Sequence, residues 1–174
     1  MKKIYPVSLV ADYFIALAHE TGTFISNSKL QKLVYYAQAW TLVELKRELI
    51  KEDFQAWIHG PVIPSLYEEY RKFSYYSIRR DDLRNSFERI ENEFEPEIQK
   101  LLGMIDREYF SCETYYLEML TNHEDPWVLT RAGLHQHIPS DRVIPKELMI
   151  KYYSKFLEEL KDEEEKPIEK PGKE

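Results

Sequence analysis

The sequence predicts a mainly α-helical domain of about six helices with at most a small β element. Apolar residues recur at helical spacing in several segments, for example at Leu30, Leu33 and Val34. Prolines and small polar residues stand where helices would begin. The chain has 174 residues, of which 43% are hydrophobic, enough to bury one core. We therefore expect one domain over residues 1–160.

The first half of the chain predicts three helices. The first begins near Ser8 and ends near Gly22, because glycine readily adopts the left-handed conformation that ends helices. One of the small polar residues at 26–28 is expected to cap the second helix. Residues 30–40 are apolar or aromatic on nearly every side, so this helix must be buried or offer aromatic surface to a partner. Pro64 is suited to be the first residue of the third helix.

Two segments of the first half are predicted to be non-helical, and a third receives no assignment. Residues 49–58 are expected to form a short strand or an extended arm. Pro61 and Pro64 disfavour helical backbone at the residues before them, which predicts an extended turn. Residues 74–94 are charged and receive no assignment.

The second half of the chain predicts further helices. Pro96 opens one of them, and Ser111 is expected to cap the next. A short helix should begin with Asp125 as its cap and Pro126 as its first residue. Pro145 opens the last predicted helix.

The composition restricts the class of protein. The net charge is −7, which disfavours a non-specific nucleic-acid binder. The single cysteine excludes an intrachain disulfide and suits a reducing compartment. No signal-peptide pattern opens the sequence and no run is long enough to span a bilayer, so we expect a cytoplasmic protein without membrane contact. Residues 161–174 are highly charged, which predicts a disordered, acidic C-terminal tail.

Three motifs carry the most specific information. Residues 30–40 read Leu-Gln-Lys-Leu-Val-Tyr-Tyr-Ala-Gln-Ala-Trp, residues 56–67 read Ala-Trp-Ile-His-Gly-Pro-Val-Ile-Pro-Ser-Leu-Tyr, and residues 125–127 read Asp-Pro-Trp. Their order and content resemble the Panacea antitoxin domain, a family also described as phage-associated GepA-like or SocA-like. The resemblance extends over residues 8–156. One departure is Asn122, which separates a threonine from a histidine that adjoin one another in the family.

The resemblance implies an antitoxin that neutralises a cognate toxin by direct protein–protein binding. The toxin is expected to be the product of an adjacent gene. A second role known in the family is that of a proteolytic adaptor, which delivers a toxin to a AAA+ protease. Neither role implies catalysis or a cofactor, and a shared fold does not determine which toxin is bound.

A partner-binding site is predicted from these motifs. Aromatic residues beside polar groups are common at interface hot spots, and a rigid Gly-Pro loop loses little entropy on binding. The predicted site comprises Lys29, Gln31, Lys32, Tyr35, Tyr36, Trp57, His59, Gly60, Pro61, Pro64, Tyr67 and Trp127. The alternative is that glycine and proline only shape a turn while the aromatic side chains fill the core.

Other functions have weaker support in the residues. The spacing of His135 and His137 matches no standard zinc site, so we predict no metal. Cys112 with the downstream His123 could suggest a cysteine hydrolase, but a lone cysteine in a helix is usually a small buried apolar residue. Residues 12–40 also resemble a helix-turn-helix, so a DNA-binding autoregulator stays as an alternative.

Overall fold

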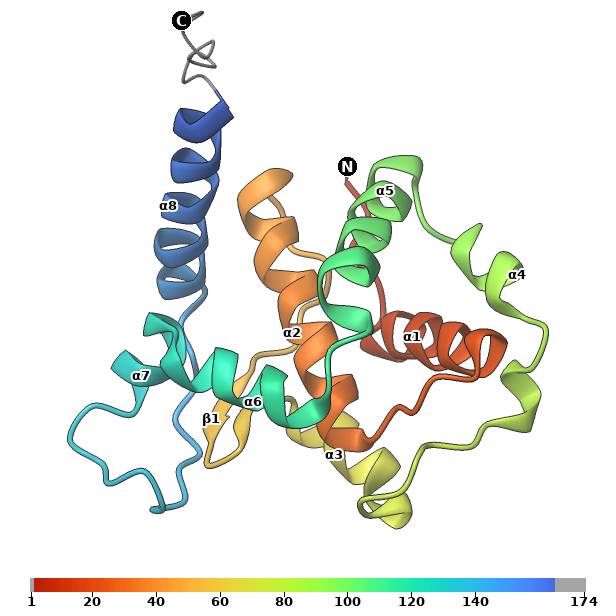
Figure 1. Ribbon diagram of the computed structural model, residues 1–174, viewed down its shortest axis with the longest axis horizontal. Helices are drawn as coiled ribbons and strands as arrows, with labels where there is room; N and C mark the ends of the chain where they lie inside the picture. The colour runs from red at the N-terminus through yellow and green to blue at the C-terminus, as the bar shows by residue number, and fades with distance from the viewer. Residues whose placement is uncertain (1, 165–174) are drawn as a thin grey trace, which may run out of the picture.

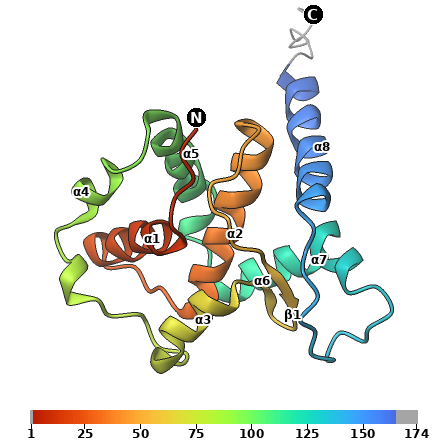
Figure 2. The same cartoon turned by 180° about the vertical axis from the view of Figure 1, so that it is seen from behind.

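Helix α2 (Asn27–Glu44) is the centre of the fold, and most other elements pack around it (Figure 1). Sixteen of its eighteen residues are buried. It contacts α1, α3, α5, α6, α8 and strand β2, and Figure 2 shows α1 and α8 on opposite sides of it. The unusual sequence of this helix, apolar or aromatic on nearly every side, is therefore explained by neighbours on nearly every side.

The computed structural model describes residues 2–164, with side chains as far as residue 159. It is mainly helical, as predicted, but this part of the chain contains eight α-helices where about six were expected. The helices are α1 (Val7–Thr21), α2 (Asn27–Glu44), α3 (Pro64–Tyr70), α4 (Phe87–Glu91), α5 (Pro96–Ile105), α6 (Thr114–His123), α7 (Asp125–Thr130) and α8 (Lys146–Glu164). Short 3₁₀ turns at Arg71–Phe73 and Asp81–Leu83 and a π-helical turn at Asp106–Phe110 join some of them.

Several predicted helix ends are confirmed. Gly22 ends α1 with a left-handed φ of +67°. Ser26 is the cap of α2, since its Oγ accepts the backbone amide of Lys29 at 3.1 Å. Pro64 and Pro96 are the first residues of α3 and α5, where the missing amide hydrogen costs nothing.

Other predicted caps are wrong. α1 begins at Val7, so Ser8 lies inside the helix rather than at its cap. Ser111 does not cap α6, because the π-helical turn after α5 carries the chain as far as Phe110 and α6 begins only at Thr114. Asp125 is the first residue of α7, and the cap position before it belongs to Glu124.

The small β element is a hairpin of strands β1 (Gln55–Trp57) and β2 (Gly60–Val62). The strands are antiparallel, with Trp57 paired to Gly60 across a two-residue turn. The segment that leads into α8 runs beside β1, where the amide of Ala56 donates to the carbonyl of Arg142 at 2.9 Å. Of the two alternatives for residues 49–58, the short strand is therefore found, but only over Gln55–Trp57. The hairpin lies between α2 and the chain before α8.

Residues 74–94, unassigned from the sequence, wrap around the far side of α1 (Figure 1). The segment contains α4 and sends Ile78, Leu83 and Ile90 into the core. Its charged side chains face outward. The buried positions are so few that the sequence shows no apolar periodicity here.

The C-terminal helix is longer than predicted. The backbone of α8 continues through Glu164, past the predicted boundary at residue 160. The rest of the predicted tail, 165–174, lies outside the described residues. Over residues 2–164, every helix is too short or too polar to cross a membrane.

Candidate functional site

The three sequence motifs meet at the β-hairpin. From α7, Trp127 donates its indole N–H to the carbonyl of Trp57 at 2.8 Å. Just after α7, the buried guanidinium of Arg131 donates to the carbonyl of Ala56, also at 2.8 Å. The side-chain amide of Asn122 on α6 donates to the carbonyl of Ile58 at 3.1 Å. The α6–α7 unit therefore fixes the hairpin from one side, since buried backbone carbonyls need such donors.

Helix α2 holds the other end of the hairpin through a buried amide relay. Gln31 Oε1 accepts the backbone amide of Ile63 at 3.0 Å, and Gln31 Nε2 donates to Asn27 Oδ1 at 3.0 Å. Asn27 Nδ2 in turn donates to the carbonyl of Tyr67 at 3.0 Å. Two neighbouring side chains on α2 thus determine where β2 ends and α3 begins.

Gly60 lies where the hairpin passes closest to α2 and α6. Its φ of +118° is a conformation that residues with a side chain rarely adopt. A Cβ at this position would come within 3.0 Å of Thr121 Oγ1 and 3.3 Å of Lys32 Cε. This close approach and the positive φ therefore require glycine at position 60.

Lys32 is buried beside the hairpin, yet its ammonium is satisfied locally. Nζ donates to the carbonyl of Ser28 at 3.2 Å and to its Oγ at 2.8 Å. Burial lowers the pKa of Lys32 to about 8, although the nearby carboxylate of Glu118 favours the charged form.

A buried carboxylate, Glu124, lies behind the hairpin at the junction of α6 and α7. Its Oε1 accepts hydrogen bonds from Tyr36 at 2.7 Å and Tyr153 at 2.9 Å. Burial raises the pKa of Glu124 to about 7, against the opposing effect of the two hydroxyl donors. Glu124 was not among the predicted site residues. The one sign of its importance in the sequence is its position directly before the Asp-Pro-Trp motif.

The predicted partner-binding residues divide into two groups by exposure. Buried members are Lys29, Gln31, Lys32, Tyr35, Tyr36, Gly60, Pro61 and Trp127. Members at the surface are Trp57, His59, Pro64 and Tyr67, of which His59 is the most exposed. Lys29 lines a surface pocket, whereas a partner reaches the other buried members only if the fold opens. Direct contact by the folded chain therefore remains a prediction for Lys29 and for the second group.

The exposed aromatic surface near the hairpin comes mainly from α6. Tyr115, Tyr116 and Met119 are 70%, 54% and 43% exposed, because α6 turns Leu117 and Thr121 inward. None of these three was predicted as a site residue. Their one signal in the sequence was the adjacent aromatic pair Tyr115 and Tyr116.

The hairpin turn adjoins α6 at Glu118. His59 Nδ1 lies 2.8 Å from Glu118 Oε1, and the rings of Trp57 and Tyr67 meet edge to face at 5.0 Å between centroids. We call the group Trp57, His59, Tyr67, Tyr115, Tyr116 and Met119 the hairpin–α6 surface. Large amphipathic side chains of this kind are typical of protein interfaces.

The structure also bears on the other functions considered. Among the side chains that the structure describes, residues 2–159, no three from His, Cys, Asp or Glu are grouped as a metal would require. Cys112 Sγ donates to the carbonyl of Glu108, and His123 Nδ1 meets the carbonyl of Met119 at 2.6 Å, so each is engaged by its own helical segment. The helix-turn-helix interpretation fails for α2, because a helix with Lys29 and Lys32 buried does not enter a DNA groove.

Comparison with known proteins places the chain in a family of antitoxin-like domains. Residues 30–128, more than half of the chain, match the family model of the antitoxin SocA-like Panacea domain, so the protein belongs to that family. This confirms the resemblance inferred from the three motifs and supports an antitoxin role. One relative is antitoxin SocA of Caulobacter vibrioides (strain NA1000 / CB15N), 49% identical over 58 residues. Those residues are 33% of this chain and 31% of the relative. No solved structure shows a significant match.

Proposed function

We propose that this protein neutralises a cognate toxin by direct contact through the hairpin–α6 surface. The observation that carries the proposal is the exposed aromatic face of α6, in a chain whose family is one of antitoxins. Tyrosine and methionine are enriched at interfaces; tyrosine buries a large area at small cost in conformational entropy, and methionine adapts to irregular apolar surfaces. The toxin is proposed to be encoded by an adjacent gene.

The predicted site residues take different parts in this proposal. Trp57, His59 and Tyr67 extend the contact area from α6 onto the hairpin and α3. Buried members such as Gln31 and Gly60 fix the shape of that area without touching the toxin. A pre-formed surface binds more tightly than one that must be ordered, because less entropy is lost.

The test co-expresses the protein with the product of the adjacent gene and scores growth and then co-purification. The informative variant is Tyr115→Ala with Tyr116→Ala, which removes two exposed rings. We expect loss of growth rescue and at least a tenfold rise in Kd, about 1.4 kcal/mol. The matched control is Tyr75→Ala with Tyr76→Ala, an adjacent tyrosine pair that is 90% and 78% exposed outside the hairpin–α6 surface.

Each outcome decides between functions. Loss of binding in the control pair but not in the α6 pair would move the interface to the loop after α3. Rescue without a stable complex, combined with a fall in toxin level that depends on a AAA+ protease, would establish the adaptor role instead. A neighbouring product that is never toxic would remove the basis for the proposal.

A further inference from the structure

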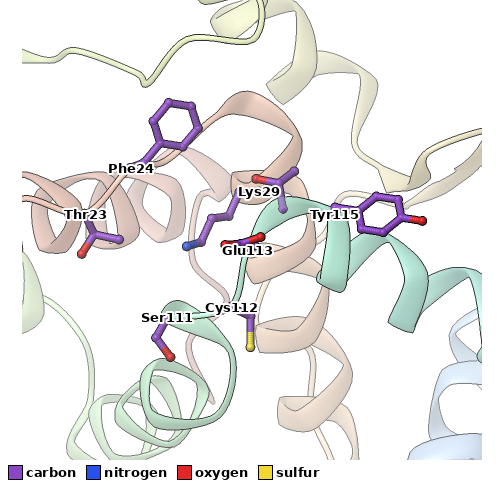
Figure 3. A pocket seen from close by; sticks show the side chains of 8 residues that line it. Thr23, Phe24, Lys29, Ser111, Cys112, Glu113 and Tyr115 are labelled. Carbon is purple, nitrogen blue, oxygen red and sulfur yellow. The ribbon is translucent and has the colours of Figure 1, made fainter.

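A pocket of about 410 Å³ opens at the N-terminal end of α6 (Figure 3). One wall is the loop between α1 and α2, with Thr23 and Phe24, and the other is the segment from Ser111 to Tyr115 that leads into α6. Lys29 enters from the first turn of α2, and its ammonium points into the space between the two walls (Figure 3).

Lys29 is the unusual group in this pocket. The residue is 4% exposed, yet among the described residues no carboxylate lies within 4 Å of Nζ and no acceptor hydrogen-bonds to it. Its nearest recorded partner is the face of the Phe110 ring, 5.3 Å from Nζ. Burial of the side chain lowers the pKa of Lys29, although its ammonium still reaches the solvent in the pocket.

Comparison with Lys32, one turn further along α2, shows that the missing partner is particular to Lys29. Lys32 is buried to a similar extent, but its Nζ is bonded to both oxygens of Ser28. Lys29 therefore differs from Lys32, because no neighbouring side chain or carbonyl in the described part of the chain accepts a hydrogen bond from its ammonium. It directs a cation without a close counter-ion into a space large enough for a small polar group.

The start of α6 brings backbone amide donors to the pocket. Thr114 is the first helical residue, and Glu113 at the cap position makes no side-chain capping bond. The free amides of the first turn and the helix dipole favour an anion there. Burial raises the pKa of the Cys112 thiol, which keeps it neutral.

We propose that this pocket binds a carboxylate of the partner protein, with the Lys29 ammonium as its counter-ion. The carboxylate belongs to an aspartate or glutamate side chain or to a chain end. This proposal rests on the proposed function, since Tyr115 belongs both to the pocket wall and to the hairpin–α6 surface. It adds a charge requirement to an interface that is otherwise aromatic, and such a requirement gives specificity.

Glu113 provides a test that distinguishes carboxylate binding from a purely structural role of the pocket. It is exposed, lines the pocket and carries the same charge as the proposed ligand. Replacing it by glutamine should therefore strengthen carboxylate binding by several fold, whereas a residue of merely structural importance would have no such effect.

The first test uses the protein alone and small probes. We would titrate the labelled protein with N-acetyl-glutamate-N′-methylamide and follow backbone amide shifts by NMR. The neutral glutamine analogue is the matched control, and N-acetylglycine tests a chain-end carboxylate. We expect shifts at residues 23–24, 29 and 111–115 and at least tenfold weaker binding of the glutamine analogue. Equal binding of the two would overturn the proposal.

The second test uses variants and the neighbouring gene product. Lys29→Met keeps the buried stem and removes the charge, so the variant should fold and should lose at least tenfold in affinity for both probe and toxin. Lys100→Met, at an exposed lysine on α5, should change neither. Normal toxin binding by folded Lys29→Met would overturn the role in partner recognition.

Glu113→Gln keeps the proposal testable if Lys29→Met does not fold, because residue 113 is exposed. Unchanged affinity of the glutamate probe in that variant would also overturn the proposal. A wild-type protein that binds the probe but not the neighbouring product would leave the pocket standing and disprove the proposed function.

Discussion

The hydroxyl of Tyr36 on α2 donates a 2.7 Å hydrogen bond to Oε1 of Glu124, the buried carboxylate between α6 and α7. The same oxygen accepts the hydroxyl of Tyr153 on α8. One carboxylate therefore links the central helix to the last helix and to the unit that holds the hairpin. Tyr36, predicted to touch a toxin, has this internal role in the folded chain.

Glu124 should make stability depend on pH. Its pKa is raised from 4.5 to about 7 in the fold, so the folded state holds this proton more tightly than the unfolded state. The stabilisation is complete below pH 4.5 and is lost as the pH rises through about 7. Glu124→Gln mimics the protonated form. Relative to wild type, it should therefore gain about 3 kcal/mol of stability between pH 4.5 and 8.

Urea unfolding of both proteins at several pH values measures this difference. Asp106→Asn is the control, because burial also raises the pKa of Asp106, to about 6, at a separate contact with Tyr13. That variant should keep the pH dependence due to Glu124. Parallel stability curves for wild type and Glu124→Gln would contradict the assignment.

Tyr36→Phe should separate stability from binding. The variant loses one hydrogen bond to Glu124 while it keeps the ring, which stacks on Tyr109 at 4.1 Å between centroids. Above about pH 8, where Glu124 is ionised, a hydrogen bond to the charged carboxylate contributes about 1.5–3 kcal/mol, so unfolding there should become easier by that amount. Toxin affinity of the folded variant should be unchanged. Weaker binding by a stable variant would show that the partner reaches α2.

Trp57→Ala should have the opposite profile. The ring of Trp57 is only partly buried and meets Tyr67 at the surface, so its removal should weaken toxin binding by at least tenfold, about 1.4 kcal/mol. The fold should survive, because the hairpin keeps the bonds from Trp127 and Arg131 to its carbonyls. Calorimetric titration measures the affinity, and circular dichroism checks the fold.

Gly60→Ala should be more harmful than the same change at Gly22. Both glycines have positive φ, but only at Gly60 would the new Cβ meet Thr121 Oγ1, at 3.0 Å. At Gly22 nothing lies within 4 Å. We expect a cost of about 1 kcal/mol at Gly22 and at least about 2 kcal/mol at Gly60. Equal thermal shifts for the two variants would show that the hairpin does not press against α6.

The sequence predicted the backbone of this site better than its contacts. Pro64 and Ser26 act locally, so their positions at helix starts were readable from neighbouring residues. Gly60 was recognised as part of a rigid loop, but its contact with Thr121 joins residues far apart in the chain, and no local pattern encodes that distance. Lys29 illustrates the same limit, because a lysine in a sequence gives no sign of burial.

The position of α2 in the chain has a consequence for synthesis. The helix is complete by Glu44, but Tyr153, which covers one of its sides, is made more than a hundred residues later. On the ribosome, the nascent chain therefore carries an aromatic helix with its final neighbours missing until α8 emerges. Such exposed apolar surface invites chaperones and proteases, so a chain interrupted before α8 is expected to be short-lived.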